Sequence, residues 1–246
     1  MPVRLSPLKQ PGANAVLVGD PRRAFLLGQA LTVQPEMSHL ARGLWGYGGV
    51  TAGGLRLTVQ ATGIGGPSAV AVIADLAGLG LRRLVRLGTC VAVGDRPEPG
   101  STFVIERAFG FDGTSRALVG SDQSRCKAEL LEPDPDLFGA LSSLAPTAAV
   151  ASHDLVHRLA PVADPDASRS GTGPPAAPAP LRDLQTAATF AIAAKLGLSA
   201  AAVLIVVENR SGDRLGDPEL ESRFEEVGLA VLPALESSLS NPRVEG

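Results

Sequence analysis

Aromatic residues are scarce in this chain of 246 residues, at 4% of the total, and only two cysteines occur. The core must therefore be built from Leu, Val, Ala and Ile. Hydrophobic residues reach 45% of the chain, which is enough for one large α/β domain. Cys90 and Cys126 lie far apart in the sequence. This spacing argues against a disulfide-stapled scaffold and favours a reducing compartment, so we expect a cytoplasmic protein.

A strong charge of one sign is also lacking, since the formal net charge is −3 at pH 7. A nucleic-acid-binding protein would present a basic face. The apolar runs are interrupted by Gly, Asp or Arg, and none reaches the roughly 18 residues of a membrane helix. Residues 1–20 lack the apolar centre of a signal peptide. We therefore expect neither nucleic acid nor a membrane as a partner.

Short apolar runs alternate with longer stretches of helical period. The expected strands are residues 15–18, 55–61, 83–87, 102–106, 148–151 and 201–207. The expected helices are residues 22–30, 68–79, 134–144, 187–196 and 218–239. This alternation indicates a mainly parallel or mixed sheet with helices on both faces. Ligands of such sheets bind at the carboxyl ends of strands, where the candidates for one shared site are Gly19, Thr62, Thr89 and Asn209.

The most informative segment, residues 62–93, has the pattern of a glycine turn, a helix, a buried strand and a polar tip. Its glycines let the backbone turn tightly and approach a ligand. Arg86 interrupts the apolar strand, and a buried guanidinium is costly unless an anion pairs with it. Thr89, just past the expected strand end, adds a hydroxyl and a backbone donor. We therefore expect phosphate to bind at Arg86 and Thr89.

Residues 160–180 are rich in Pro, Ala, Gly and Ser, which predicts a mobile surface loop or a lid over the site. The sequence shows no internal repeat or domain boundary, so we expect a single domain over residues 1–246. Cys90 is typical of a small buried apolar residue rather than a reactive thiol. His153 and His157 lie four residues apart, but no third ligand is evident nearby, so we expect no metal site.

Four motifs connect this chain to a known family. They are GDPRRA at 19–24, TGIGGPS at 62–68, RLGT at 86–89, and Asn209-Arg210 after VLIVV. With these motifs in this order, most of the chain resembles the nucleoside phosphorylase family, and the uridine phosphorylase branch most closely. The resemblance implies a single-domain, three-layer α/β/α fold with a central mixed, partly barrel-like sheet. It also implies assembly into homodimers that build a homohexamer.

The activity implied by the resemblance is phosphate-dependent cleavage of a nucleoside, uridine or a related pyrimidine nucleoside, to free base and ribose 1-phosphate. Phosphate is then a co-substrate, and no cofactor is needed. By the same resemblance, Gly19 and Arg23 bind phosphate together with Arg86 and Thr89, and Arg42 reaches the phosphate of a neighbouring subunit. Each charged hydrogen bond to phosphate contributes about 1.5–3 kcal/mol. Surface ion pairs are the competing interpretation of Arg23 and Arg42.

The family's ribose motif, Glu-Met-Glu, is replaced here by Asp183-Leu184-Gln185. The resemblance places these residues at the ribose together with Thr89. Gln185 can accept a hydrogen bond through its carbonyl but carries no charge. Since charge-assisted hydrogen bonds are roughly twice as strong as neutral ones, we expect weaker sugar binding.

Base recognition also departs from the family pattern. Arg210 matches a position that serves the pyrimidine ring, with an exposed surface arginine as the competing interpretation. Arg158 is a candidate in the region where the family reads uracil. These changes leave a second hypothesis open, a non-catalytic or substrate-shifted relative that keeps the phosphate site but has lost the ribose and base contacts. A hydrolytic nucleosidase fits less well. Its nucleophile is water rather than phosphate, so it does not need three arginines to bind an anion.

Overall fold

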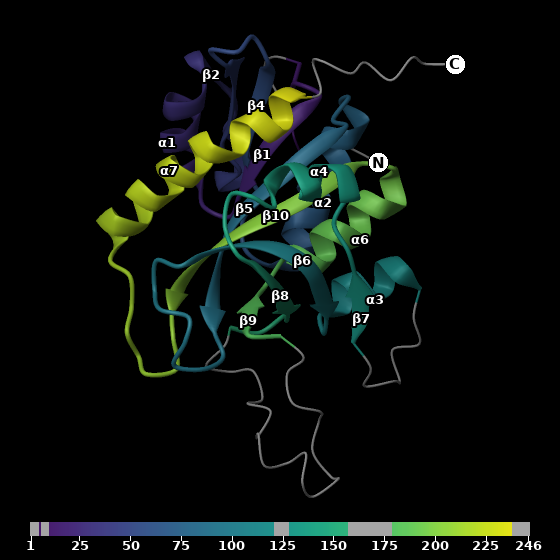
Figure 1. Ribbon diagram of the computed structural model, residues 1–246. Helices are drawn as coiled ribbons and strands as arrows, with labels where there is room; N and C mark the ends of the chain where they lie inside the picture. Colours follow the sequence, from purple (N-terminus) through teal and green to yellow (C-terminus); the bar gives the residue numbers. More distant parts are fainter. Residues whose placement is uncertain (1–4, 6–9, 121–127, 157–178, 238–246) are drawn as a thin grey trace, which may run out of the picture.

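The computed structural model describes residue 5 and residues 10–120, 128–156 and 179–237 (Figure 1). Ten strands in this part of the chain form one sheet. The strands are β1 (Asn14–Val18), β2 (Val33–His39), β3 (Gly46–Val50), β4 (Arg56–Ala61), β5 (Arg83–Ala92), β6 (Thr102–Gly110), β7 (Glu129–Leu131), β8 (Thr147–Ser152), β9 (Leu181–Asp183) and β10 (Ser199–Glu208). The helices are α1 (Pro21–Leu31), η1 (Ala41–Gly43), α2 (Gly65–Gly78), α3 (Gly113–Val119), α4 (Pro135–Leu141), α6 (Thr186–Leu196) and α7 (Asp217–Glu236).

The sheet is mixed, and part of it closes on itself. Strand β10 pairs in parallel with β5 and antiparallel with β6, so that β5, β10, β6, β8 and β9 form a ring. Strands β1, β4, β3 and β2 extend the sheet outward from β5. The arrangement confirms the predicted fold class, a three-layer α/β/α architecture around a mixed, partly barrel-like sheet. It also brings the carboxyl ends of the parallel strands β1, β4, β5 and β10 to one region.

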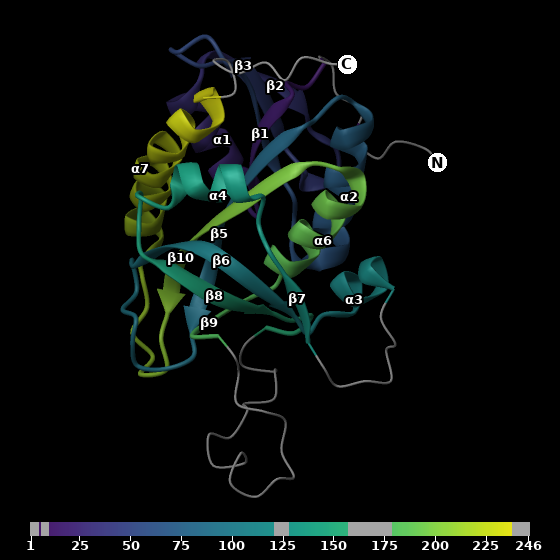
Figure 2. The ribbon, with the colours of Figure 1, turned by 45° about the vertical axis from the view of Figure 1, so that its right-hand side comes forward.

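Helices cover both faces of the sheet, as Figure 2 shows. Helices α1, α4 and α7 lie on one face, where Leu27, Phe224 and Val231 join the apolar side chains of the strands. Helices α2 and α6 pack together on the other face, over a cluster that includes Ile73 and Phe190. Burial of each such side chain contributes about 1.5–3 kcal/mol. The two clusters therefore hold the strand ends in fixed positions.

Strand β5 is longer than the apolar pattern predicts, because it continues from the expected end at residue 87 to Ala92. Gly88 and Thr89 interrupt the apolar run. Strand β10 pairs with this stretch along one edge, and β9 pairs with its last residues along the other. Such pairing overrides local propensity. Thr89 therefore lies within a strand rather than beyond its end.

Sequence periodicity missed strands β2, β3, β7 and β9 and helix α3. The first five residues of β2 are mostly exposed, so the strand shows no alternation of apolar and polar residues. Strands β7 and β9 have three residues each, too few to show a period. Helix α3 follows Asp112, whose carboxylate accepts a hydrogen bond from the Ser115 amide at 2.7 Å.

Two expectations concern regions that the structure covers only in part. The predicted loop or lid at residues 160–180 lies outside the described residues, apart from residues 179 and 180. The single domain expected over residues 1–246 stays a prediction. Across the residues that are described, every helix is too short or too polar to cross a membrane.

Candidate functional site

A cleft of about 290 Å³ lies where β1, β4, β5, β9 and β10 end. Its lining residues come from segments that are far apart in the sequence and are brought together by the sheet. The lining includes most of the predicted site residues, namely Gly19, Arg23, Arg86, Thr89, Asp183, Leu184 and Gln185. The strand ends thus assemble one candidate site, as expected for ligands of α/β sheets.

Arg86 is held at the floor of the cleft by three acceptors from the chain itself. Its Nη2 lies 2.9 Å from Asp183 Oδ2, its Nη1 donates to Gln185 Oε1 at 2.9 Å, and its Nε donates to Thr186 Oγ1 at 3.2 Å. The side chains of Arg86 and Asp183 are 7% and 0% exposed. The counter-charge that a buried guanidinium requires is therefore supplied by Asp183, before any ligand binds. One N–H on each terminal nitrogen is left for a ligand.

Asp183 and Gln185, two of the predicted ribose ligands, are hydrogen-bonded within the chain. Besides Arg86, Asp183 accepts from Ser152 Oγ and from the backbone and hydroxyl of Thr186. The Gln185 amide donates to the Gly63 carbonyl at 2.7 Å and accepts from a threonine hydroxyl at 3.2 Å. Gln185 thus connects the glycine turn to Arg86. A ribose hydroxyl must share or replace one of these internal hydrogen bonds.

The glycine turn forms the wall beside Arg86. Gly63 and Gly65 have φ values of 72° and 82°, a left-handed conformation that favours glycine. Helix α2 begins in this turn, and no side chain caps its N-terminus at Ile64. The first amide groups of a helix carry partial positive charge, which favours a nearby anion. The turn therefore adds to the positive potential of this end of the cleft.

Arg23, on α1, reaches the same cleft from the opposite wall. Its guanidinium lies 4.6 Å from the centre of the Phe224 ring. Burial lowers the pKa of Arg23, against the effect of nearby carboxylates, Asp20 first among them. The described residues place no carboxylate in an ion pair with this side chain, whereas Arg22 pairs with Glu221 at the surface. Arg23 is thus a half-buried cation with donors available to a ligand.

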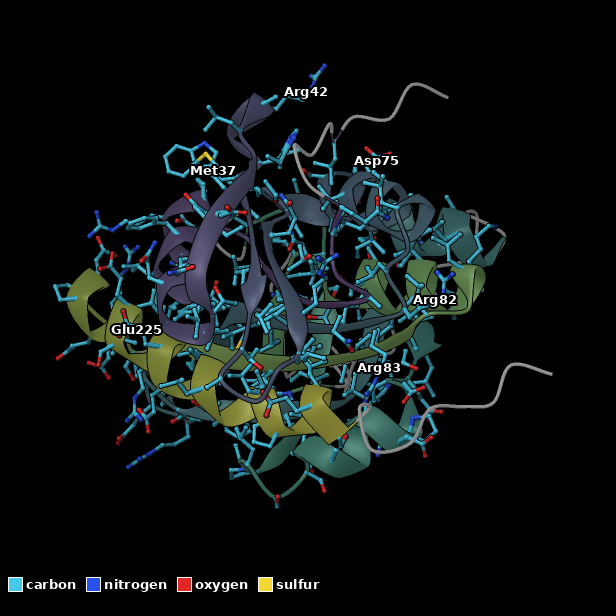
Figure 3. The ribbon with its side chains drawn as sticks, turned by 90° about the horizontal axis from the view of Figure 1, so that it is seen from above. Met37, Arg42, Asp75, Arg82, Arg83 and Glu225 are labelled. Atoms are coloured by element: carbon cyan, nitrogen blue, oxygen red, sulfur yellow. The ribbon has the colours of Figure 1, made fainter. Side chains whose placement is uncertain are left out.

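The remaining predicted residues lie elsewhere. Arg42 is exposed in η1 with a φ of 61°, and Figure 3 shows it at the periphery, pointing away from the ribbon. Arg210 is exposed in the loop after β10 and does not line the cleft. The Asn209 amide braces this loop by donating to the Asp95 carbonyl at 3.1 Å. Arg158 lies outside the described residues.

Cys90 lines the cleft but is not suited to nucleophilic chemistry. It is a free cysteine, 2% exposed, within one of the two apolar clusters. Burial raises the pKa of its thiol, and the Asp183 charge adds to this effect. Since the thiolate is the reactive form, Cys90 remains an inert thiol at neutral pH, as the sequence predicts. The described residues also contain no cluster of His, Cys, Asp and Glu that could hold a metal ion.

Of two further polar residues in the cleft, sequence reasoning missed Arg182 and considered His153 only as a metal ligand. Arg182 on β9 is 8% exposed, and its Nε has no hydrogen-bond partner in the part of the chain that the structure describes. The His153 ring stacks on Phe111 with 5.0 Å between ring centres, and its buried Nε2 also lacks a partner. The argument applied to Arg86, a guanidinium within an apolar run, does not extend to Arg182, because Asp183 follows it directly. The strand that carries it is too short to recognise in the sequence.

Comparisons with known proteins were made for both sequence and structure. Residues 14–232 match the family described as the phosphorylase superfamily. A stretch of 79 residues is 37% identical to a DeoD-type purine nucleoside phosphorylase of Oceanobacillus iheyensis, and the match covers 32% of this chain and 33% of that protein. A stretch of 105 residues is 32% identical to a uridine phosphorylase of Haemophilus influenzae, covering 43% and 41%. These matches thus span less than half the length of either relative.

The structural comparison finds a similar fold. The crystal structure of a purine nucleoside phosphorylase from Toxoplasma gondii in complex with immucillin-H superposes with a TM-score of 0.75. The superposition covers 94% of this chain and 92% of that one, at 17% sequence identity. At this identity the likeness concerns the fold alone.

Proposed function

The chain belongs to the phosphorylase superfamily, and on that premise we propose that it transfers the glycosyl group of a nucleoside to inorganic phosphate. The main supporting observation is that Arg23 and Arg86, from separate segments, line one cleft at the strand ends. Gly19 and Thr89 lie in the same lining. Three arginines against two aspartates give this lining a net positive charge, which suits a phosphate dianion.

The proposed reaction is phosphorolysis. A phosphate oxygen bonds to the anomeric carbon while the bond from that carbon to the base nitrogen breaks. The electron pair of the broken bond leaves with the base, which solvent then protonates. Arg23 and Arg86 position the nucleophile, and phosphate stabilises the positive charge that develops on the sugar. Leu184 and Thr89 are proposed to contact the ribose, with Asp183 and Gln185 beneath it.

The identity of the base is the finer part of this proposal. The preference for uridine or a related pyrimidine nucleoside rests on the resemblance of the sequence, and the relatives include purine as well as uridine phosphorylases. Arg210 and Arg158 remain predicted base contacts. We propose phosphate as the only co-substrate, without a metal or other cofactor, and neither a nucleic acid nor a membrane as a partner. The cytoplasmic location stays a prediction.

One observation favours a second candidate function, a relative that binds an anion without catalysis. The Asp183 carboxylate and the Gln185 side-chain amide are both engaged by internal hydrogen bonds, and Gln185 has no carboxylate to offer a sugar. Such a protein would bind phosphate at Arg23 and Arg86 but would not cleave nucleosides.

A single assay separates these possibilities. Purified protein is incubated with uridine, thymidine, inosine or adenosine, with and without phosphate, and the free base is measured. We expect release of base only in the presence of phosphate, with ribose 1-phosphate (deoxyribose 1-phosphate from thymidine) as the second product. Base release that ignores phosphate would identify a hydrolase. Phosphate binding without any base release would support the non-catalytic relative.

We also propose that Arg42 completes the phosphate site of a neighbouring copy in a homodimer or homohexamer. A non-glycine residue with a positive φ costs of order 1 kcal/mol or more, and Arg42 adopts this conformation at an exposed position. Arg42→Gly should therefore make the monomer slightly more stable while it weakens phosphate binding about tenfold or more. Thermal unfolding and calorimetric titration with phosphate measure the two effects. Unchanged phosphate affinity in this variant would remove Arg42 from the site.

A further inference from the structure

Arg182 is a buried cation for which the described residues supply no counter-charge. It lines the cleft, and its nearest carboxylate in sequence, Asp183, is engaged by Arg86. Burial lowers the pKa of the Arg182 guanidinium, yet arginine titrates so far above neutral pH that the group stays charged. An unpaired buried charge is costly. The position therefore indicates a ligand that offers electron density to a guanidinium.

His153 lies within electrostatic reach of Arg182. Burial, and then the Arg182 charge, lower the pKa of the imidazole, against the effect of Asp183 and Asp154. The ring is therefore neutral at neutral pH and offers one donor and one acceptor. Its stacking on Phe111 fixes the plane of the ring. Two polar side chains with unpartnered atoms thus line the cleft within electrostatic reach of each other.

The surroundings of this pair suit a flat heteroaromatic ring. Val91 pairs with Arg182 across the sheet and lies two residues beyond Thr89, or about 7 Å along β5. Val207, Leu155 and Val156 also line the cleft. This end is therefore apolar apart from the two polar side chains, and it is separated from Arg86 along the strand. A sugar would bridge the phosphate end and the apolar end.

We propose that Arg182, with His153 beside it, selects a nucleobase that carries a carbonyl oxygen rather than an amino group at C4 of a pyrimidine or C6 of a purine, and stabilises the negative charge on that base as the glycosidic bond breaks. A guanidinium only donates hydrogen bonds, so it pairs with a carbonyl oxygen but not with an exocyclic amino group. A site built to donate to one partner rejects an analogue that cannot accept, because the buried donors are then left unpaired. This inference rests on the proposed function and names the class of base.

The experiment compares matched bases that carry either a carbonyl oxygen or an amino group at one position, C4 of the pyrimidines and C6 of the purines, and the member with the oxygen there is the carbonyl member of its pair. The dissociation constants of uracil and cytosine, and of hypoxanthine and adenine, are measured by calorimetry on the full chain with phosphate present. We expect the carbonyl member of each pair to bind more tightly. Arg182→Leu should lose about 10- to 100-fold in affinity for that member and change little for the other. Arg107→Leu, at an exposed strand position, is the matched control and should leave all four affinities unchanged.

Two further readouts make the result decisive. Because Arg182→Leu removes an unpaired buried charge, we expect an unchanged or raised melting temperature, and Arg182→Gln repeats the test with a polar side chain. Equal binding of both members of each pair, or equal losses in the variant, would overturn the inference. So would a lowered melting temperature in both variants, which would mark Arg182 as a structural residue. Selective base binding without nucleoside cleavage would support the selection of the base by Arg182 while contradicting both its role in bond cleavage and the proposed function.

Discussion

Replacement of Arg86 by methionine should destabilise the folded protein by about 3–5 kcal/mol, because it leaves the Asp183 carboxylate buried without its counter-charge. The Asp183 side chain is 0% exposed, and its ion pair with Arg86 has an N···O distance of 2.9 Å. The same change should weaken phosphate binding by about 1.5–3 kcal/mol, since two donors are lost from the cleft. Urea unfolding and calorimetric titration with phosphate measure the two quantities.

A second variant separates the structural effect from the binding effect. In the double variant Arg86→Met with Asp183→Asn, no charge is left unpaired, so part of the stability should return. The phosphate affinity should stay low. Arg223→Met, which breaks an exposed ion pair with Glu226, is the control and should change stability by less than about 1 kcal/mol. A double variant that binds phosphate as tightly as the natural protein would exclude Arg86 from the site.

Gly88→Ala should disturb the same cleft through a single methyl group. A Cβ atom at this position would lie 2.6 Å from Arg86 Cζ and 2.6 Å from Nη2. The guanidinium is fixed by three acceptors, so either these hydrogen bonds break or β5 shifts. Overpacking of this kind costs about 1–3 kcal/mol, and we expect phosphate affinity to fall more than tenfold. Chemical unfolding and phosphate titration again provide the measurements.

The control for Gly88 is a strand glycine at which an added Cβ atom would have open space around it. A Cβ atom on Gly48 in β3 meets nothing within 4 Å, and neither Gly48 nor Gly88 has a positive φ. Gly48→Ala should therefore be neutral, or stabilising by about 0.4–1 kcal/mol, through its effect on the unfolded chain. If Gly88→Ala behaved like Gly48→Ala in both assays, the close packing of Arg86 on Gly88 would matter neither for stability nor for phosphate binding.

The fold was largely predictable because its strands and helices carry strong hydrophobic patterns. The runs that became β1, β4 and β10 are buried along nearly their whole length, and each is followed or preceded by a helix with a regular apolar face. Strand β2 was not predictable, since most of its residues are exposed and its pairing with β3 is a tertiary property. The sequence interpretation ended β5 at residue 87, which was wrong, because the pairing of β5 with β9 and β10 continues the strand to Ala92.

The candidate site was predictable only where a motif carried it. Motifs identified Arg23 and Arg86, and the structure places both in one cleft. Periodicity and motifs could not reveal which buried groups form ion pairs and hydrogen bonds with each other. The ion pair of Arg86 with Asp183 depends on how β5 and β9 meet. The same packing leaves Arg182 Nε without a hydrogen-bond partner among the described residues. These pairings decide which charges are available to a ligand.

The three hydrogen bonds that Arg86 donates also determine when this side chain loses its conformational freedom. An arginine side chain carries about 2 kcal/mol of rotamer entropy, and here that entropy is lost when the chain folds rather than when an anion arrives. Arg23, in contrast, rests on the Phe224 ring and retains more freedom until a ligand orders it. An incoming oxyanion therefore meets one preorganised donor and one adaptable donor, so its orientation is set by Arg86 before Arg23 closes on it.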